Sequence, residues 1–231
     1  MNKLYYLAFV IFLISCTASR NSGKSVPNQT FVKIETDSGT MIAKLSRKTP
    51  LTTNNFIKLV KKHFYDGLLF HRVVKGFMIQ AGDPDTKNAK KGQVFGEGGL
   101  GYTIPAEFDT SLFHEKGALA MARESDNNNP KKASSSTQFY IVDGRTFTNK
   151  EMDKIEERFK ILIPENHREI YRTIGGDPFL DMNYTVFGQV IKGLDVIDKI
   201  ATAAKDKNNR PLTDIKMKIT ILKKKDLKNY Q

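Results

Sequence analysis

Short apolar runs separated by turn residues limit the folds open to this chain more than any other sequence feature. Segments rich in Val, Ile, Leu, Phe and Met alternate with turns such as Asp37-Ser38-Gly39, the pattern of short strands joined by hairpins. The pattern predicts strands at 31–34, 41–45, 68–74, 77–82, 118–122, 138–142, 186–191 and 217–222. We therefore expect a mainly β fold in which an antiparallel sheet closes into a barrel, with a β-sandwich as the alternative.

Two other segments have helical periodicity. Phe56, Leu59 and Val60 recur at helical spacing within 50–62, and Pro50 stands where a helix begins, a position at which no backbone N–H is needed. The apolar segment 194–200 predicts a second helix. Both helices have an apolar face to bury, so we expect them to cap the two ends of the barrel.

The segment 143–178 interrupts the strand pattern. Met152, Ile155 and Phe159 predict one amphipathic helix within 151–160, and Ile170, Tyr171 and Ile174 a second within 165–174. The Gly-Gly-Asp-Pro run at 175–178 ends the second helix. We interpret 143–178 as a helical hairpin inserted into a loop. It either packs on the barrel without a further role or forms a lid or a partner-docking surface.

The N-terminus combines a short positive start with an apolar run from Leu4 to Ile14 that is too short to span a bilayer but long enough for a signal peptide. Leu13-Ile14-Ser15-Cys16 resembles a bacterial lipobox and contains the only cysteine of the chain. We expect residues 1–15 to be removed and Cys16 to be lipidated, although a signal peptide without lipid is the alternative. Residues 16–29 would then form the lipidated cysteine and a flexible tether, 30–225 the folded domain and 226–231 a tail. This arrangement predicts a protein of the cell envelope, anchored to a bacterial membrane on its periplasmic or outer-membrane face.

The net charge of +12 on 231 residues has three possible meanings: a nucleic-acid partner, an anionic membrane surface or a lysine-rich surface exposed to water. The lysines are scattered, and the only dense cluster is Lys223 to Lys225. Since neither an RNP-like strand, nor zinc-finger spacing, nor a continuous basic helix accompanies them, we expect no nucleic-acid partner.

Motifs for covalent or metal chemistry are missing from the sequence. The glycine-rich segment 96–101 lacks the Lys-Ser/Thr of a phosphate-binding loop, and no Gly-x-Ser-x-Gly elbow occurs. The four histidines do not have metal-ligand spacing. We therefore expect no metal, no cofactor and no nucleophile.

Polar residues do interrupt three of the apolar strands. Arg72 and Gln80 lie within the stretch 70–83, and Gln138 begins the predicted strand 138–142. With the period of two, Met78 shares a face with Gln80, and Tyr140 shares one with Gln138. The pattern indicates an apolar groove with a few hydrogen-bonding groups, unless these groups only satisfy one another or the solvent.

The same stretches resemble the cyclophilins. The segment Phe-His-Arg followed by Gly-Phe-Met-Ile-Gln-Ala-Gly-Asp at 70–83 is the most specific match, and 117–122, 136–142 and 180–190 match in the same order. The resemblance covers roughly 31–222. It implies a closed eight-stranded antiparallel barrel capped by two helices, with an active groove on its outer surface, and peptidyl-prolyl cis/trans isomerase activity.

The resemblance also assigns roles to single residues. Arg72 matches the catalytic arginine, and Gln80 is expected to orient it. The positions that match the substrate-binding groove are Phe77, Met78, Gly96, Ala122, Arg123, Gln138, Tyr140, Phe179, Leu180 and Tyr184. Many cyclophilins have tryptophan where this chain has Phe179, histidine where it has Tyr184 and asparagine where it has Arg123. Loss of the indole N–H implies weak binding of cyclosporin.

The sequence thus predicts a monomeric isomerase that acts on proline-containing polypeptides, assists the folding of exported or envelope proteins and is attached to the membrane through Cys16. Two other functions remain open at this point. One is a module that binds proline motifs with little catalysis, and the other is a basic surface protein that binds an anionic polymer or lipid.

Overall fold

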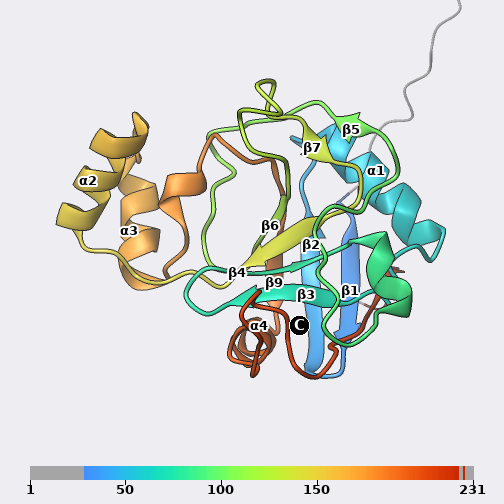
Figure 1. The fold of residues 1–231 in the computed structure, drawn as a ribbon. Helices are drawn as coiled ribbons and strands as arrows, with labels where there is room; N and C mark the ends of the chain where they lie inside the picture. The colour runs from blue at the N-terminus through green and yellow to red at the C-terminus, as the bar shows by residue number, and fades with distance from the viewer. Residues whose placement is uncertain (1–28, 224–225, 227–231) are drawn as a thin grey trace, which may run out of the picture.

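The computed structural model describes residues 29–223 and 226, and an eight-stranded antiparallel sheet forms the body of the molecule (Figure 1). The strand order is β10-β1-β2-β9-β6-β8-β4-β3. These strands are β1 Phe31–Thr36, β2 Gly39–Leu45, β3 Phe70–Val74, β4 Met78–Ala81, β6 Ala118–Met121, β8 Phe139–Val142, β9 Val186–Lys192 and β10 Met217–Leu222. A second sheet pairs β5 Thr103–Ile104 with β7 Ser134–Ser135. The expectation of a mainly β fold built on an eight-stranded antiparallel sheet is confirmed.

The sheet curls until its two edge strands, β3 and β10, approach each other. An isolated bridge joins Leu69 to Lys216, and the amide of Phe70 donates to the carbonyl of Ile215 at 3.0 Å. Further along β3, the amide of Val73 donates to the carbonyl of Asn209 at 2.8 Å. Within 29–223 the two edges form no continuous ladder, so the expected closure of the barrel is not confirmed.

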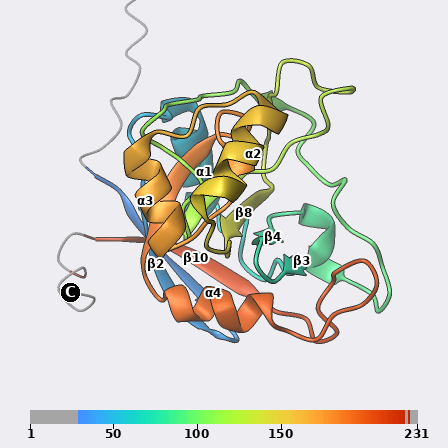
Figure 2. The same cartoon turned by 90° about the vertical axis from the view of Figure 1, so that its left-hand side faces the viewer.

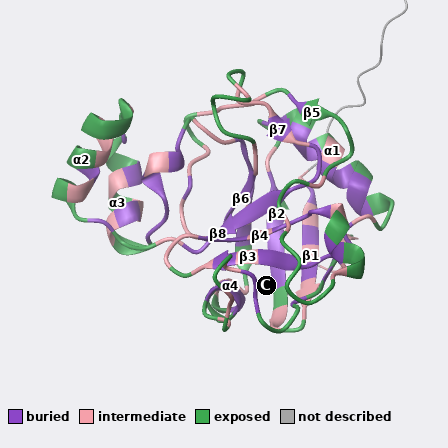
Figure 3. Ribbon diagram, in the orientation of Figure 1, coloured by how far each residue is buried: buried purple, intermediate pink, exposed green. Residues whose placement is uncertain are grey.

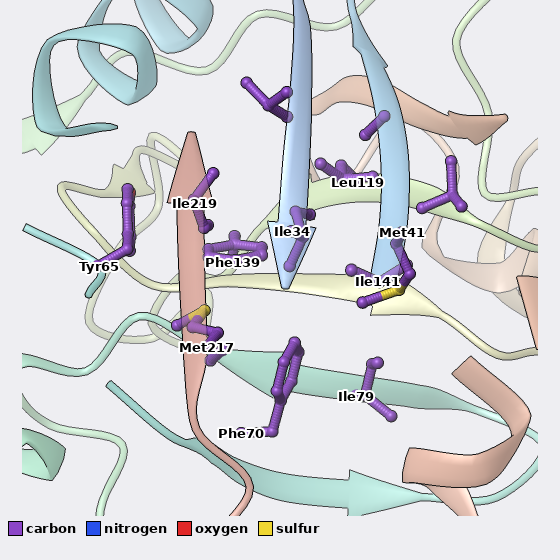
Figure 4. Close-up of a cluster of buried hydrophobic side chains, with 14 of the residues drawn as sticks. Ile34, Met41, Tyr65, Phe70, Ile79, Leu119, Phe139, Ile141, Met217 and Ile219 are labelled. Atoms are coloured by element: carbon purple, nitrogen blue, oxygen red, sulfur yellow. The ribbon is translucent and has the colours of Figure 1, made fainter. Parts of the chain in front are cut away.

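Alternation along the strands gives the sheet an inner and an outer apolar face. On β8, Phe139 and Ile141 point into the main core, whereas Tyr140 and Val142 belong to a separate cluster on the other face. The side chains of the main core, including Ile34, Met41 and Ile219, meet between the strands (Figure 4).

Two helices cover the curled sheet, as the apolar periodicity predicts. Helix α1 (Pro50–Lys61) packs against β10, and α4 (Leu194–Ala201) packs against β2, β3 and β4 (Figure 2). The ring of Phe56 on α1 lies 5.0 Å from that of Tyr65 and 5.4 Å edge-on from that of Phe139. Because Phe56 is fully buried, its truncation to alanine would destabilise the fold by about 3–5 kcal/mol.

Helices α2 (Asn149–Phe159) and α3 (Glu165–Thr173) form a hairpin that stands to one side of the sheet (Figure 1). Thr148 and Glu151 form a capping box at the start of α2. The hairpin has a small core of its own, centred on Phe147, Met152 and Tyr171. Its outward faces are mostly exposed (Figure 3). It lies within the inserted segment expected from the sequence.

A glycine holds the end of this hairpin against the body of the protein. Gly176 forms isolated bridges with Glu115 and Arg145. Its φ is +155°, and a Cβ atom there would lie 2.1 Å from the carbonyl oxygen of His114. Only glycine allows this close approach of two backbone segments.

Several predictions concern residues outside 29–223 and 226: the signal peptide 1–15, the lipidated Cys16, nearly all of the tether, and Lys224 and Lys225 with most of the tail. None of the helices between residues 29 and 223 is both long enough and apolar enough to cross a membrane.

Candidate active site

An apolar cluster lies on the outer face of the sheet, where β4, β6 and β8 run side by side. Met78 and Tyr140 form its floor, and Leu180 from the short 3-10 helix η2 (Pro178–Leu180) adds a buried side wall. Half-buried rings of Phe77 and Phe179 pack at its rim. This cluster contains the residues that the resemblance assigns to the proline-binding part of the groove, and it is called the pocket below.

Arg72 is half-buried beside this pocket because β3 and β4 pair it directly with Gln80. Its Nη1 donates to Gln80 Oε1 at 3.3 Å and lies 4.0 Å from the sulfur of Met78. Its Cζ is 5.7 Å from the ring centroid of Phe77. No carboxylate of the described chain lies within ion-pair distance of it. Burial lowers the pKa of Arg72, but a guanidinium remains charged at any physiological pH.

A chain of amides holds the arginine in place. Gln80 Nε2 donates to Gln138 Oε1 at 3.1 Å. Gln138 Nε2 in turn donates to the carbonyl oxygens of Gly96 and Gly98, each at 2.8 Å. The donors and acceptors alternate, so the amide of Gln80 is oriented with its oxygen toward Arg72.

The glycine loop that ends this chain is itself fixed by Asp83. The carboxylate of Asp83 is fully buried and accepts hydrogen bonds from the amides of Gly96 at 2.6 Å and Gly98 at 3.2 Å. A Cβ atom on Gly98 would lie 2.0 Å from Asp83 Oδ1, so the loop needs glycine there. Asp83 also caps the short helix η1 (Pro84–Asn88). The end of β4 is thus tied to the loop across the groove.

A polar cavity of about 780 Å³ opens between this loop and the segment that follows β6. Gln80, Gly96, Ala122 and Gln138 line it, together with Arg123. The cavity is continuous with the amide chain, so a peptide backbone lying along the groove could exchange hydrogen bonds with it.

Arg123 fixes one wall of the pocket rather than presenting a free charge. Its guanidinium forms an ion pair with Asp126 at 2.6 Å and donates to the carbonyl of Asn183 at 2.7 Å. Its Cζ lies 4.6 Å from the ring centroid of Tyr184, which packs edge-on against Tyr140 at 5.9 Å. With 5% of its side chain exposed, Arg123 holds Tyr184 against the pocket.

Behind the pocket, Tyr140 ends a buried chain of hydrogen bonds. Its hydroxyl is 2.9 Å from Nε2 of His114, and Nδ1 of His114 is 2.8 Å from Asp181 Oδ1. Tyr171 of α3 donates to Asp181 Oδ2 at 2.7 Å. Because a carboxylate only accepts, Nδ1 of His114 carries the hydrogen, and in the neutral ring Nε2 accepts from Tyr140. Burial raises the pKa of Tyr140 well above its ordinary value, so its hydroxyl remains protonated.

Sequence patterns do not mark three members of this hydrogen-bonded chain, His114, Tyr171 and Asp181, as site residues. His114 has no metal-ligand spacing, and the spacing of Tyr171 predicts only burial on a helix. The one usable signal concerns Asp181, which lies inside the matched segment 180–190. The part of the chain with described side chains contains no cluster of His, Cys, Asp or Glu that could hold a metal ion.

All site residues expected within the described part of the chain lie together here. They belong either to the apolar cluster or to its hydrogen-bonded rim: Arg72, Phe77, Met78, Gln80, Gly96, Ala122, Arg123, Gln138, Tyr140, Phe179, Leu180 and Tyr184. Cys16 lies outside the described residues.

Comparison with known proteins agrees with this geometry. Residues 31–221 match the family model described as "Cyclophilin type peptidyl-prolyl cis-trans isomerase/CLD". The chain belongs to the cyclophilin family. Its enzyme class is therefore that of the peptidyl-prolyl cis-trans isomerases.

Curated relatives of this cyclophilin include staphylococcal proteins named as peptidyl-prolyl cis-trans isomerases. The protein of Staphylococcus saprophyticus is 32% identical over 81% of this chain and 89% of its own length, and that of Staphylococcus aureus strain USA300 is 33% identical over 80% and 87%. A solved cyclophilin-type isomerase of Cryptosporidium parvum superposes with a TM-score of 0.63 at 23% identity, covering 85% of this chain and 99% of that one. At that identity the superposition shows the shared fold.

Proposed function

We propose that this cyclophilin accelerates rotation about X–Pro bonds by placing the charge of Arg72 near the proline nitrogen. The uncatalysed barrier is about 18–20 kcal/mol, because rotation breaks the amide resonance that gives the C–N bond double-bond character. In the twisted state the nitrogen regains a lone pair. A guanidinium close to it stabilises that state and gains little from the planar one, which is differential binding of the transition state.

Rotation about the X–Pro bond also requires that one half of the substrate is held still while the other half turns, and the pocket would hold that half. Met78, Tyr140 and Leu180 would hold the proline ring, while Gln80 orients the guanidinium. The polar cavity beside Gln138 would hold the backbone of the other half during rotation. This mechanism involves no bond making, which is consistent with the lack of nucleophile and metal motifs in the sequence.

One observation carries the proposal. Arg72 is half-buried among apolar side chains and hydrogen-bonded by an amide, and no acidic group of the described chain neutralises it. A charge kept in such a place is available to a ligand. A further solved form of the Cryptosporidium parvum isomerase, with a TM-score of 0.61, was obtained in the presence of the dipeptide Ala-Pro, which supports a proline-containing substrate for this chain too.

A protease-coupled proline-isomerisation assay on the purified protein and Arg72→Ala tests the mechanism. We expect kcat/KM to fall about 100-fold or more, as when a preorganised electrostatic donor is removed, with the melting temperature little changed. Arg172→Ala, which removes a half-buried arginine of α3 that is paired with Glu165 and Glu169, is the matched control and should keep the wild-type rate. Equal rates for Arg72→Ala and wild type would indicate a proline-binding module instead of a catalyst.

We further propose that the enzyme is a monomer anchored by lipid on Cys16 and assists the folding of exported or envelope polypeptides. The apolar run ending in Leu13-Ile14-Ser15-Cys16 supports this assignment. Wild type should partition with membranes and incorporate labelled palmitate in a bacterial host, whereas Cys16→Ser should do neither. Retention of the label by Cys16→Ser, or its absence from wild type, would contradict the anchor.

A further inference from the structure

Three phenylalanine rings form a row from the pocket onto the helical hairpin. Phe77, just before β4, and Phe179, in η2, have ring centroids 5.8 Å apart with an interplanar angle of 30°. Phe179 and Phe159, the last residue of α2, are 6.0 Å apart at 32°. The rings are tilted by about 30° at both steps and follow one another at ring-contact distance, so the apolar wall of the pocket continues onto the inserted segment.

The position of Phe159 on α2 explains why it reaches the pocket. Met152 and Ile155 lie on the inward stripe of α2 and pack in the hairpin's core with Tyr171. Phe159 is four residues after Ile155, so it continues the same stripe by one turn. At that turn α2 contacts η2, and the ring of Phe159 therefore lies on Phe179.

The row remains accessible to a ligand. Phe159 is 41% exposed, although large apolar side chains on inward helix stripes are usually buried, and Phe77 and Phe179 are half-buried. None of the three lines the polar cavity that contains Gln80. The row and the cavity can therefore be occupied by different parts of one bound peptide.

We propose that Phe77, Phe179 and Phe159 form an aromatic subsite for a side chain of the polypeptide a few residues from the isomerised proline. Steps of 5.8 and 6.0 Å extend the row at most about 12 Å from Phe77, and an extended peptide advances about 3.3–3.6 Å per residue, so the side chain about three positions from the proline reaches Phe159. This inference rests on the proposed function.

The chemistry of the row selects an aromatic side chain. A ring of the substrate can stack on Phe159 in an offset or edge-on arrangement, which an aliphatic chain cannot match. The guanidinium of Arg158 lies over the same ring, with Cζ 5.3 Å from its centroid. A second aromatic ring there would also contact this cation.

Proline peptides with a movable phenylalanine test the subsite. Three substrates would be compared: one with alanine at all flanking positions, one with Phe three positions before the proline and one with Phe three positions after it. We expect one of the two Phe substrates to have a kcat/KM about two- to tenfold above that of the alanine substrate. In Phe159→Ala this ratio should fall toward one.

Leu162→Ala is the matched control, because Leu162 belongs to the same hairpin and is 82% exposed but makes no ring contact with the row. It should keep the wild-type ratio. A ratio near one in wild type for both placements, or an equal loss in both variants, would overturn the subsite. A concentration-dependent dimer of wild type that Phe159→Ala abolishes, measured by sedimentation, would overturn it too. Inactivity of wild type on every substrate would instead refute the isomerase mechanism.

Discussion

The curled sheet and the helical hairpin differ in how their residues are held. The core of the sheet joins side chains from all eight strands with α1 and α4. The hairpin has a few buried residues around Met152 and Tyr171, and its remaining faces are exposed. A core of that size cannot offset the entropy of ordering two helices.

The hairpin is therefore stabilised by its contacts with the site. Tyr171 reaches the pocket floor through Asp181, and Phe159 reaches the rim through Phe179. The sheet therefore positions Arg72 and Gln80, whereas the hairpin depends on its contacts with the site and shapes the pocket from behind. The substitutions and pH changes below act on the sheet or on the hairpin, and the response of the two regions is compared.

The largest effect is expected from Gly176→Ala. Its positive φ and the clash with the carbonyl of His114 should destabilise the end of the hairpin by roughly 2–4 kcal/mol. Hydrogen exchange should accelerate in α2 and α3 while β1 and β2 keep their protection. Gly92→Ala, where φ is +76° but no atom lies within 4 Å, is the control and should cost about 1 kcal/mol or less. Equal acceleration in β1 and β2 would show that both regions unfold as one unit.

Tyr171→Phe and Tyr65→Phe remove one buried hydroxyl from each region. Tyr171 donates to the carboxylate of Asp181, and its loss should lower the unfolding free energy by about 1–3 kcal/mol. Tyr65 donates to the carbonyl of Thr137 at 3.2 Å, and its loss should cost about 0.5–1.5 kcal/mol. Urea titration measures both. A larger loss for Tyr65→Phe would contradict a special role for the chain behind the pocket.

The two regions should respond to pH with opposite signs. Burial, with Asp143 and Asp181 nearby, raises the pKa of Asp177 to about 8, whereas burial lowers the pKa of His71 on β3 to about 4. Asp177 thus contributes stability at low pH that is lost as the pH rises through 8. His71 contributes stability above pH 6.5 that is lost as the pH falls toward 4.

Between pH 6.5 and 8 only the titration of Asp177 changes the stability of the fold. The free energy of unfolding should therefore fall over this interval by at most about 2 kcal/mol, and Asp177→Asn should remove most of the fall. Urea titrations of both proteins at the two pH values give the comparison. The same decrease in Asp177→Asn as in wild type would disprove the assignment to Asp177.

The smallest effect concerns the rim. Phe179 has no N–H to donate, so cyclosporin should bind weakly, and Phe179→Trp should tighten binding about tenfold through one added hydrogen bond and a larger ring. Titration calorimetry gives the dissociation constants. A nanomolar value for wild type would show that the indole N–H is dispensable here.

The sequence predicted the sheet and the groove because both depend on alternation along strands. The period of two predicted that Met78 and Gln80 share a face, and on β4 that face lies opposite the main core, to which Ile79 and Ala81 belong. Strands β5 and β7 could not be predicted, because two residues are too few for a period. The contact between His114 and Asp181 joins residues 67 positions apart, and periodicity has no information on such pairs.

The covered edge of β3 has a consequence for the proposed action on unfolded polypeptides. Such chains carry unpaired N–H and C=O groups that readily add to an open sheet edge as an extra strand. On β3 the amides of Phe70 and Val73 already donate to the segment 209–215. These amides of β3, the strand that carries Arg72, are thus already hydrogen-bonded, while its side chains remain available to the groove. A polypeptide can therefore bind in the groove and dissociate without adding to the sheet as a ninth strand.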